Sequence, residues 1–404
     1  MANIEGKRIL VGTTGSIAVY KSVELVRLLK KAGAVVHVAM TENATWFVNP
    51  LTFETLSGNS VIENMFSQPG TSIDHISLGQ ESDCIVIAPA TANFIGKIAH
   101  GIGDDFLSTL LLAATAKILI CPAMNKAMFA NSIVQSNILS LKQRGYIVME
   151  PEEGMLATGV VGLGRFPEPL TIMEEIQCLL TNKDLQGLKT LVTAGPTIEY
   201  IDPVRIISNK STGKMGYAIA KAARRRGADV TLVAGPTHLD APKGMHILKV
   251  ETAEEMRKAV MDHYRDKDVI IKAAAVSDYK PLNKAKEKQK KKEGKTTVEM
   301  TPTPDILAEL GKDKGDRILV GFAAETTDHV ANALNKIQKK NLDLIVLNDV
   351  SKNDRGFAAE TNEVRMIDSK GNEEVVPLMS KDEVADKILD SIKYLRTEWI
   401  QEKS

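Results

Sequence analysis

The sequence lacks several features that would each point to a particular class of protein. Lys plus Arg number 51 and Asp plus Glu number 51 among 404 residues, so the formal net charge is zero. A protein that binds nucleic acid through general electrostatics would carry a basic excess, so this balance disfavours that class. Aromatic residues make up only 4% of the chain, which disfavours a stacking platform for single-stranded nucleic acid. We therefore expect no nucleic-acid partner.

Cysteines and long apolar runs are also scarce. Cys84, Cys121 and Cys178 lie far apart, form no CxxC pair and cannot build a disulfide framework. No apolar run reaches the length of about 18 residues that a transmembrane helix needs. The first residues, MANIEGKRILVG, lack the apolar core of a secretion signal. The sequence therefore predicts a reduced, cytoplasmic protein with no membrane partner.

Short apolar runs that alternate with helical segments predict the fold. The predicted strands cover residues 8–11, 35–40, 84–88, 118–121, 147–149, 189–193, 230–233, 269–272, 318–320 and 344–347. Strands that alternate with helices imply right-handed βαβ units and parallel sheets covered on both faces. The predicted class is therefore α/β, with two Rossmann-like or flavodoxin-like domains in series. Each domain would be a mostly parallel sheet flanked by helices, and the polar residues 181–188 read as a linker.

Three loops in the first half follow predicted strands and meet at one edge of the sheet. They are the loops VGTTGSIAVYK, APATAN and CPAMNKAM, all rich in small and hydroxyl side chains. In open α/β sheets, ligands collect at the carboxyl ends of the strands. Gly15 permits a tight turn, and Ser16 falls near a helix start, where free backbone N–H groups favour a phosphate. This edge suits a flat ring with one phosphate tail.

A second loop of this kind opens the other half of the chain. The segment TAGPTIEYIDPVRIISNKSTGKMG follows a predicted strand, and Gly216 begins a helix. Ser211, Thr212 and Gly213 offer hydroxyl and backbone donors that suit a triphosphate. The loop is not a Walker A motif, because G-x-x-x-x-G-K-[ST] occurs nowhere in the chain.

Longer motifs resemble a known family. GSIAVYK, IDHISL, APATANFIGKIAHGIGDD, PAMNKAM and PEEGMLATGVVGLGRFPEP are similar to the flavin-dependent cysteine decarboxylases. AAAVSDYK, TPDIL and GFAAET extend the resemblance to bacterial enzymes that join phosphopantothenoylcysteine decarboxylase to phosphopantothenate–cysteine ligase in coenzyme A synthesis. The resemblance spans about residues 6–395. It implies an FMN-binding decarboxylase domain over 1–180, a linker over 181–188 and a CTP-dependent ligase domain over 189–404.

The resemblance assigns roles in the first half. His75 would take the substrate thiol proton as a neutral imidazole, and the amide of Asn125 would hold the substrate carboxylate. Without the resemblance, His75 would be interpreted as structural and Asn125 as a cap. Trp46 and Phe47 would pack either near the flavin ring or in the core. The implied FMN contacts are Gly15, Ser16, Thr41, Thr91 and Asn93.

One residue departs from the family pattern. Residues 152–168 resemble the loop that closes over the substrate, which in the coenzyme A enzymes carries a catalytic cysteine acid. Thr158 stands at that place, and the loop contains no cysteine. A thiol, with a pKa of about 8.5, can protonate an enethiolate carbon, whereas a threonine hydroxyl is a far weaker acid. Three explanations stay open: an engineered residue, another acid acting through water, or release of an oxidised enethiol.

The resemblance also assigns the chemistry of the second half. A carboxylate would attack the α-phosphate of CTP to form an acyl-cytidylate, which cysteine's amine would then resolve. Asn209 would serve that turnover, and Asp278 would bind Mg2+. Lys288 matches a catalytic flap lysine by its spacing from Asp278, with Lys290 as the alternative in the lysine-rich stretch 284–295, which by charge alone would be a solvated loop. The implied CTP contacts are Ser211, Thr212, Gly213, Ala274, Asp278, Lys288, Thr303, Pro304, Asp305, Ile306, Phe322, Lys336 and Lys340.

The implied overall reaction makes 4′-phosphopantetheine from 4′-phosphopantothenate, cysteine and CTP, through 4′-phosphopantothenoylcysteine. The family also implies a homo-oligomer, a dodecamer of trimers and dimers. Two alternatives stay open: oxidative decarboxylation of peptide C-terminal cysteines, which the attached ligase half disfavours, and a non-catalytic flavin subunit, which His75 and Asn125 disfavour. In a mixed case, an active ligase is joined to a decarboxylase that stalls at the oxidised enethiol.

Overall fold

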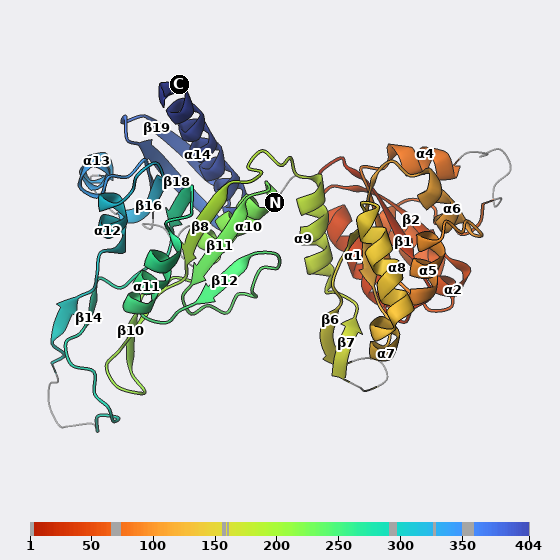
Figure 1. Ribbon diagram of the computed structural model, residues 1–404, viewed down its shortest axis with the longest axis horizontal. Helices are drawn as coiled ribbons and strands as arrows, with labels where there is room; N and C mark the ends of the chain where they lie inside the picture. The colour runs from red at the N-terminus through yellow and green to blue at the C-terminus, as the bar shows by residue number, and fades with distance from the viewer. Residues whose placement is uncertain are drawn as a thin grey trace. The chain divides into compact units, whose positions relative to one another are not determined.

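The computed structural model describes residues 4–65, 74–155, 159, 161–290, 297–325, 329–349 and 359–403. Among these, the chain forms two compact units, which divide between Thr181 and Asn182 (Figure 1). Each unit has a central sheet with buried apolar side chains on both faces. In the described residues, no helix combines the length and the apolar character needed to cross a membrane.

The first unit is built on a five-stranded parallel sheet in the order β2–β1–β3–β4–β5. Its strands are β1 (Arg8–Thr13), β2 (Val35–Met40), β3 (Cys84–Ala90), β4 (Lys117–Pro122) and β5 (Ile147–Val148). A separate antiparallel hairpin pairs β6 (Glu152–Met155) with β7 (Val161–Arg165). The helices are α1 (Val19–Lys31), α2 (Glu42–Thr45), α3 (Pro50–Ser57), α4 (Asp74–Glu81), α5 (Ala92–Ala99), α6 (Phe106–Ala113), α7 (Lys126–Ala130), α8 (Ser132–Gln143) and α9 (Pro169–Leu180).

Strand β3 shows why this sheet is covered on both sides. Its residues are all buried, and successive side chains of a strand point to opposite faces. Cys84 and Val86 belong to the cluster with α1, α3 and α9, whereas Ile85 and Ile87 belong to the cluster with α5, α6 and α8. A continuous apolar run is therefore what a doubly covered parallel strand requires.

The second unit has an eight-stranded sheet in the order β12–β11–β8–β13–β16–β17–β18–β19. The strands are β8 (Lys189–Ala194), β11 (Asp229–Ala234), β12 (His246–Lys249), β13 (Val269–Lys272), β16 (Ile318–Glu325), β17 (Leu344–Asp349), β18 (Thr361–Asp368) and β19 (Glu373–Ser380). The first six in spatial order are parallel, and β18 and β19 are antiparallel. Two further hairpins pair β9 (Ile198–Tyr200) with β10 (Ile206–Ser208) and β14 (Tyr279–Pro281) with β15 (Met300–Pro302).

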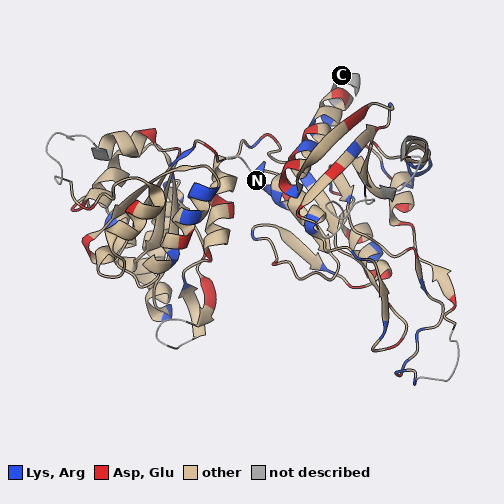
Figure 2. Cartoon of the chain, turned by 180° about the vertical axis from the view of Figure 1, so that it is seen from behind, with Lys and Arg blue, Asp and Glu red and all other residues tan. Residues whose placement is uncertain are grey.

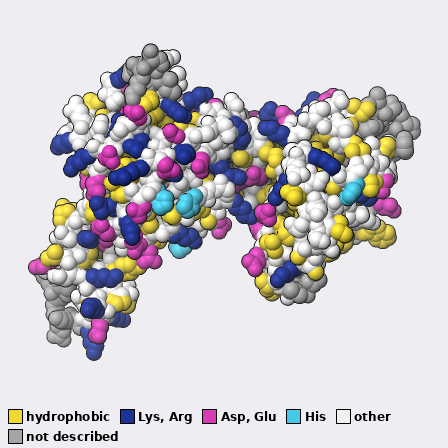
Figure 3. Space-filling view, viewed as in Figure 1, with side chains coloured by type: hydrophobic (Ala, Val, Ile, Leu, Met, Phe, Trp, Pro, Cys, Tyr) yellow, Lys and Arg dark blue, Asp and Glu magenta, His cyan; other side chains and the backbone are white. Residues whose placement is uncertain are grey.

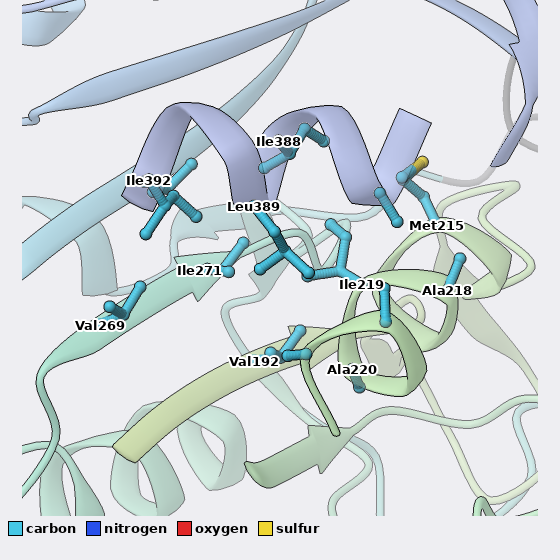
Figure 4. Close-up of a cluster of buried hydrophobic side chains, with 14 of the residues drawn as sticks. Val192, Met215, Ala218, Ile219, Ala220, Val269, Ile271, Ile388, Leu389 and Ile392 are labelled. Atoms are coloured by element: carbon cyan, nitrogen blue, oxygen red, sulfur yellow. The ribbon is translucent and has the colours of Figure 1, made fainter. Parts of the chain in front are cut away.

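Helices cover both faces of this second sheet as well. They are α10 (Lys214–Arg225), α11 (Ala253–His263), α12 (Ile306–Lys312), α13 (His329–Lys340) and α14 (Lys381–Lys403). Helices α10 and α14 share one buried cluster, and α11, α12 and α13 share the other. Figure 4 shows side chains of α10 and α14, such as Ile219 and Leu389, gathered against Val192 and Ile271 of the sheet.

The predicted fold class is confirmed, since each predicted strand lies in or overlaps a strand of a parallel sheet. The sequence reasoning missed β12, the antiparallel pair β18–β19 and the three small hairpins. Strand β18 alternates buried and less buried residues instead of forming one apolar run. A search for buried runs passes over such a half-exposed strand.

Candidate functional sites

In the first unit, three loops are tied together at the carboxyl edge of the sheet. The Thr41 N–H donates to the Thr13 carbonyl at 3.1 Å, which joins the loops after β2 and β1. The Thr14 hydroxyl donates to the Pro89 carbonyl at 2.8 Å and accepts from the Thr91 N–H at 3.0 Å. The loops after β1, β2 and β3 therefore form one connected rim, as predicted for a ligand site at this edge.

The backbone of this rim comes close to its neighbours at Gly15. A Cβ atom there would lie 2.5 Å from Cβ of Asn43, so only glycine fits without a shift. Ser16 N–H donates to the Thr14 carbonyl at 2.7 Å just before α1. The Thr91 hydroxyl caps α5 by accepting from Phe94 N–H at 3.3 Å.

Two hydroxyls of the rim have no protein partner. The Oγ1 atoms of Thr13 and Thr41 are buried and make no hydrogen bond to any residue that the structure describes. Buried polar atoms are normally satisfied, so both suit a ligand with polar atoms. Asn93 lies exposed in the first turn of α5. The residues predicted to contact FMN thus lie on this rim, at or directly after the ends of β1, β2 and β3.

The loop after β4 joins the same edge, because Ala123 N–H donates to the Ala90 carbonyl at 3.0 Å. Asn125 caps α7 through Oδ1, which accepts from Ala127 N–H at 2.8 Å. Its Nδ2 makes no hydrogen bond within the described part of the chain and can donate to a ligand. The β6–β7 hairpin (Figure 1) lies against this loop, since Met124 N–H donates to the Gly164 carbonyl at 3.0 Å.

The side chains of two residues predicted to be catalytic in this half lie outside the part of the chain that the structure describes. The backbone of His75 lies on α4, which packs beside α6, and its side chain lies outside the described residues. Thr158 also lies outside them, between β6 and β7. Trp46 is 82% exposed and Phe47 is 47% exposed, so the interpretation of these two as core residues is wrong.

The second unit contains a cavity of about 480 Å³ at the start of α10 and the carboxyl ends of β13, β16 and β17. Eight residues predicted from the sequence line it: Asn209, Ser211, Gly213, Ala274, Asp278, Phe322, Lys336 and Lys340. Six others do not belong to its described lining: Thr212, Lys288, Thr303, Pro304, Asp305 and Ile306. Gly213 has φ +79°, a left-handed conformation that favours glycine. Asn209 Nδ2 donates to the Ala275 carbonyl at 3.1 Å, which ties this loop to the loop after β13.

The charge of the cavity lining is strongly biased. Its described lining has one carboxylate, Asp278, and six lysines: Lys210, Lys214, Lys272, Lys336, Lys340 and Lys381. Figure 2 shows acidic and basic residues interspersed along both units, and Figure 3 shows their side chains mixed on one face, so the bias belongs to the cavity and not to the surface as a whole. Lysines collected in a concave site attract polyanions.

Burial perturbs two of these lysines. Burial lowers the pKa of Lys272 to about 8. Asp305 and Asp278 oppose this pKa shift, and the nearby Lys340 adds to it. Burial, followed by the charge of Lys214, lowers the pKa of Lys381 to about 8. Burial alone would raise the pKa of Asp305, but the ion pair with Lys340 at 2.8 Å keeps it below its usual value. Strongly shifted groups that share a cleft mark it as a functional site.

Two asparagines lie at the same cavity and were not predicted. Asn362 is 1% exposed, and its Nδ2 donates to Asn348 Oδ1 at 2.9 Å. Asn362 Oδ1 has no partner among the described residues, so it can accept a hydrogen bond from a ligand. Lys210, Lys214, Lys272 and Lys381 were also missed. Of these, Lys272 ends a predicted strand at the ligand-binding edge, which was a signal available in the sequence.

Asp278 is not part of a cluster of three or more metal-ligand residues in the described part of the chain. Within the described ranges, no group of three or more His, Cys, Asp or Glu residues could hold a metal ion. Mg2+ is commonly bound through one or two carboxylates together with substrate phosphates. Asp278 therefore fits a magnesium ion that arrives with a nucleotide and does not fit a permanent all-protein site.

Two α/β units with ligand edges, one lined by hydroxyls and one by lysines, define the class: a flavoprotein-type unit followed by a nucleotide-type unit in one chain. The family model described as Flavoprotein matches residues 1–181. The model described as DNA/pantothenate metabolism flavoprotein C-terminal domain matches residues 185–395. The family models thus cover nearly the whole chain.

Full-length relatives give the particular family. The coenzyme A biosynthesis bifunctional protein CoaBC of Bacillus subtilis (strain 168) is 48% identical over 397 residues, 97% of this chain and 98% of the relative. The protein of that name from Escherichia coli (strain K12) is 41% identical over 396 residues, 96% of this chain and 97% of the relative. A solved C-terminal domain of a CoaBC protein covers 54% of this chain and 100% of that domain, with 42% identity and a TM-score of 0.47.

The chain belongs to the family of coenzyme A biosynthesis bifunctional proteins. The family resemblance found in the sequence is thereby confirmed. The prediction of an enzyme that joins a flavin-dependent decarboxylase to a ligase is confirmed with it.

Proposed function

We propose that the chain catalyses two successive steps, each in one unit. Residues 182–404 ligate cysteine to 4′-phosphopantothenate with CTP. Residues 1–181 then decarboxylate 4′-phosphopantothenoylcysteine to 4′-phosphopantetheine with FMN. The observation that carries the proposal is the cavity of six lysines and one carboxylate, in a chain of this family. Such a cavity fits the reaction of a phosphorylated acid with a nucleoside triphosphate.

In the ligase step, the lysines balance the charge of two anionic substrates. The substrate carboxylate attacks the α-phosphorus of CTP, the bond to pyrophosphate breaks, and an acyl-cytidylate forms. Lys336 and Lys340 neutralise charge on the phosphates, and the backbone N–H groups at the start of α10 bind their oxygens. Asp278 holds Mg2+ together with those phosphates.

The second half of the ligase step resolves the acyl-cytidylate. The amine of cysteine attacks the acyl carbon, the carbon–oxygen bond to CMP breaks, and an amide results. Asn209 orients the acyl group from its place beside Ala275. Lys288 contributes a cation from the segment after β14. Phe322 supports the cytidine, and Thr303, Pro304, Asp305 and Ile306 shape its pocket from behind the lining.

In the decarboxylase unit, the rim fits FMN. The unpaired hydroxyls of Thr13 and Thr41 supply hydrogen-bond partners, and Gly15 lets the backbone approach the cofactor closely. FMN, when bound, supplies reversible oxidation of the cysteine side chain of the substrate. His75 takes the proton of the thiol, and Asn125 Nδ2 holds the carboxylate that leaves as CO2.

One observation supports a second candidate function, in which the decarboxylase stalls at the oxidised enethiol. The final step needs an acid at the β6–β7 loop, where the sequence has Thr158. Cys84 and Cys121 are buried in strands of the sheet, and Cys178 lies in α9. No cysteine of the chain can therefore replace the missing thiol on that loop.

Mass spectrometry of the products distinguishes these two candidates. The purified chain receives phosphopantothenate, cysteine, CTP and Mg2+, and the flavin absorbance is followed alongside. Phosphopantetheine with oxidised flavin at the end supports the complete pathway. A product two hydrogens lighter, with bleached flavin after one turnover, supports the stalled form. Thr158→Cys should then restore turnover, whereas the matched Thr158→Ser, which adds no thiol, should not. Absence of any amide product would overturn the ligase proposal.

The assembly and location remain proposals on family grounds. We infer a homo-oligomer, a dodecamer of trimeric decarboxylase units and dimeric ligase units, in the cytoplasm. Light scattering after size-exclusion chromatography tests the assembly, and a monomer at micromolar concentration would contradict it.

A further inference from the structure

A buried carboxylate lies outside the cavity, in the turn between β9 and β10. Asp202 has a fully buried side chain and four hydrogen-bond donors. Oδ1 accepts from the N–H groups of Val204 and Arg205, both at 2.8 Å. Oδ2 accepts from Arg205 Nη1 at 3.1 Å and from Gln289 N–H at 3.2 Å. A buried carboxylate is tolerated only when it is satisfied in this way.

Three of these bonds are local to the turn, but the fourth reaches a distant segment. Gln289 is 87 residues further along the chain, directly after Lys288. The hydrogen bond from Val204, together with those from Arg205 and Gln289, holds the pKa of Asp202 below its usual value. Asp202 therefore stays an acceptor for Gln289 at neutral pH.

Two further contacts fix the same segment, residues 284–290, on the β9–β10 hairpin. Lys284 Nζ lies 4.4 Å from the ring centroid of Tyr200, a cation–π contact. Ala285 N–H donates to the Ile201 carbonyl at 2.9 Å. Lys288 lies exposed between the anchored residues Ala285 and Gln289. Its side chain makes no hydrogen bond within the described part of the chain and can reach a ligand.

We infer that Asp202 is a positioning residue for Lys288. It acts by accepting a hydrogen bond from the backbone N–H of Gln289, the residue that follows Lys288. The inference rests on the proposed role of Lys288 in the ligase reaction. Asp202 does not touch the substrate. It ties the segment that carries the cation to the β9–β10 turn, which limits the positions that the cation can take before substrates arrive.

The sharpest test removes the backbone N–H of residue 289, and because proline also fixes φ there and restricts the backbone of Lys288, its result is compared with that of Asp202→Asn below. Gln289→Pro lacks the backbone N–H that Asp202 accepts, whereas Gln289→Ala keeps it and serves as the matched control. In the full chain with saturating CTP, we expect Gln289→Pro to lower kcat of ligation by about tenfold or more. The KM for CTP should stay within about twofold, because the cavity is unchanged. Gln289→Ala should stay within about twofold in both constants.

A double-mutant cycle shows whether the effect passes through Lys288. Lys288→Ala should lower kcat by about a hundredfold, and Asp202→Asn should lower it by about tenfold alone. Asp202→Asn added to Lys288→Ala should cost less than about twofold more. Additive losses would overturn the inference while leaving the role of Lys288 intact. An unchanged kcat in Lys288→Ala would overturn both, and a chain whose wild type forms no amide would overturn the proposed function itself.

Trypsin digestion supplies a readout that a general loss of stability would not move. Cleavage after Lys286, Lys288 and Lys290 should quicken by about tenfold in Asp202→Asn, relative to cleavage elsewhere. The exposed Asp240→Asn is the matched control and should match wild type. Uniformly faster cleavage across the chain would contradict a positioning role.

Discussion

The two units place their ligand sites at the same edge of similar sheets but line them differently. The rim of the first unit presents hydroxyls and close-packed backbone, and the Oγ1 atoms of Thr13 and Thr41 have no hydrogen-bond partner in the part of the chain that the structure describes. The cavity of the second presents six lysines against Asp278. Strand topology decides where a ligand binds, since both sites lie at carboxyl ends of parallel strands. We propose that the charge of the lining decides which ligand binds: one phosphate tail in the first unit, several phosphates in the second.

One helix glycine in each unit shows how differently the helices pack against their neighbours. Gly216 in α10 lies so close to β8 that an added Cβ would be 2.5 Å from Cβ of Ala194. Gly96 in α5 of the first unit has its nearest neighbour at 3.8 Å, an ordinary contact. The same substitution should therefore have opposite effects in the two units.

Gly216→Ala should give the largest effect. Because α10 must move away from β8, we expect unfolding of the second unit to become easier by about 1–3 kcal/mol. CTP binding should weaken by more than about tenfold, because α10 also forms a wall of the cavity. Gly96→Ala should leave CTP binding unchanged and stabilise the first unit by about 0.5–1 kcal/mol. Thermal unfolding measures the stability of both variants, and titration with CTP measures their binding. Equal effects of the two substitutions would contradict the difference in packing.

Lys272→Met should give the next largest effect, and only in the second unit. At pH 7 we expect CTP binding to weaken by about tenfold, since a cation of the cavity is lost. In the wild type without ligand, the pKa of Lys272 is about 8. Above this pH the side chain is mostly neutral, so binding of CTP to the charged form must take up a proton. Affinity should then fall by up to about tenfold per pH unit, whereas Lys272→Met should show a weaker dependence. The exposed Lys387→Met is the matched control, and a mutant with the pH profile of wild type would refute the assignment.

The lowered pKa of Lys272 also makes the stability of the second unit depend on pH. The pKa of Lys272 in the folded chain, about 8, lies below the usual lysine value of 10.5, so the unfolded chain binds more protons between these pH values. Its contribution to the free energy of unfolding therefore rises with pH from about 8 to 10.5. Denaturant titrations at pH 7.5 and 10 should show a smaller gain for Lys272→Met than for wild type.

Thiol labelling should give the smallest difference between the two units, because it reports on the first unit alone. All three cysteines belong to the first unit. Burial raises the pKa of Cys84 to about 12 and raises that of Cys121 well above its usual value. In the native chain, only Cys178 should react readily with a thiol reagent. Rapid labelling of all three in native buffer would contradict the buried positions, while labelling in denaturant should report unfolding of the first unit alone.

The parallel strands could be predicted because burial on both faces demands continuous apolar runs. The runs around Val86 and Ile271 are of this kind, and the loops after them followed from topology. The β18–β19 pair could not be found in this way, because a strand such as β19 has mostly exposed residues. Its place beside β17 depends on long-range pairing that no local pattern encodes.

The cavity of the second unit was predicted only in part, because some of its residues come from elements whose position no local pattern encodes. Ser211 was predicted from a polar loop that follows a predicted strand, and Asp278 from the family resemblance of AAAVSDYK. Asn362 and Lys381 come from β18 and the start of α14, whose positions follow only from the folded sheet. The contact from Asp202 to Gln289 spans 87 positions, a separation at which sequence spacing carries no information.

Helix α14 begins at the cavity with Lys381 and continues into the core, where Ile388, Leu389 and Ile392 are buried against α10. Amide hydrogens along such a helix exchange with solvent only when it opens locally or with the whole unit. A ligand that stabilises its first turn raises the free energy of that opening. Occupancy of the nucleotide site should therefore slow deuterium uptake over residues 385–392, about one to three turns beyond Lys381, while α9 of the other unit keeps its own rate.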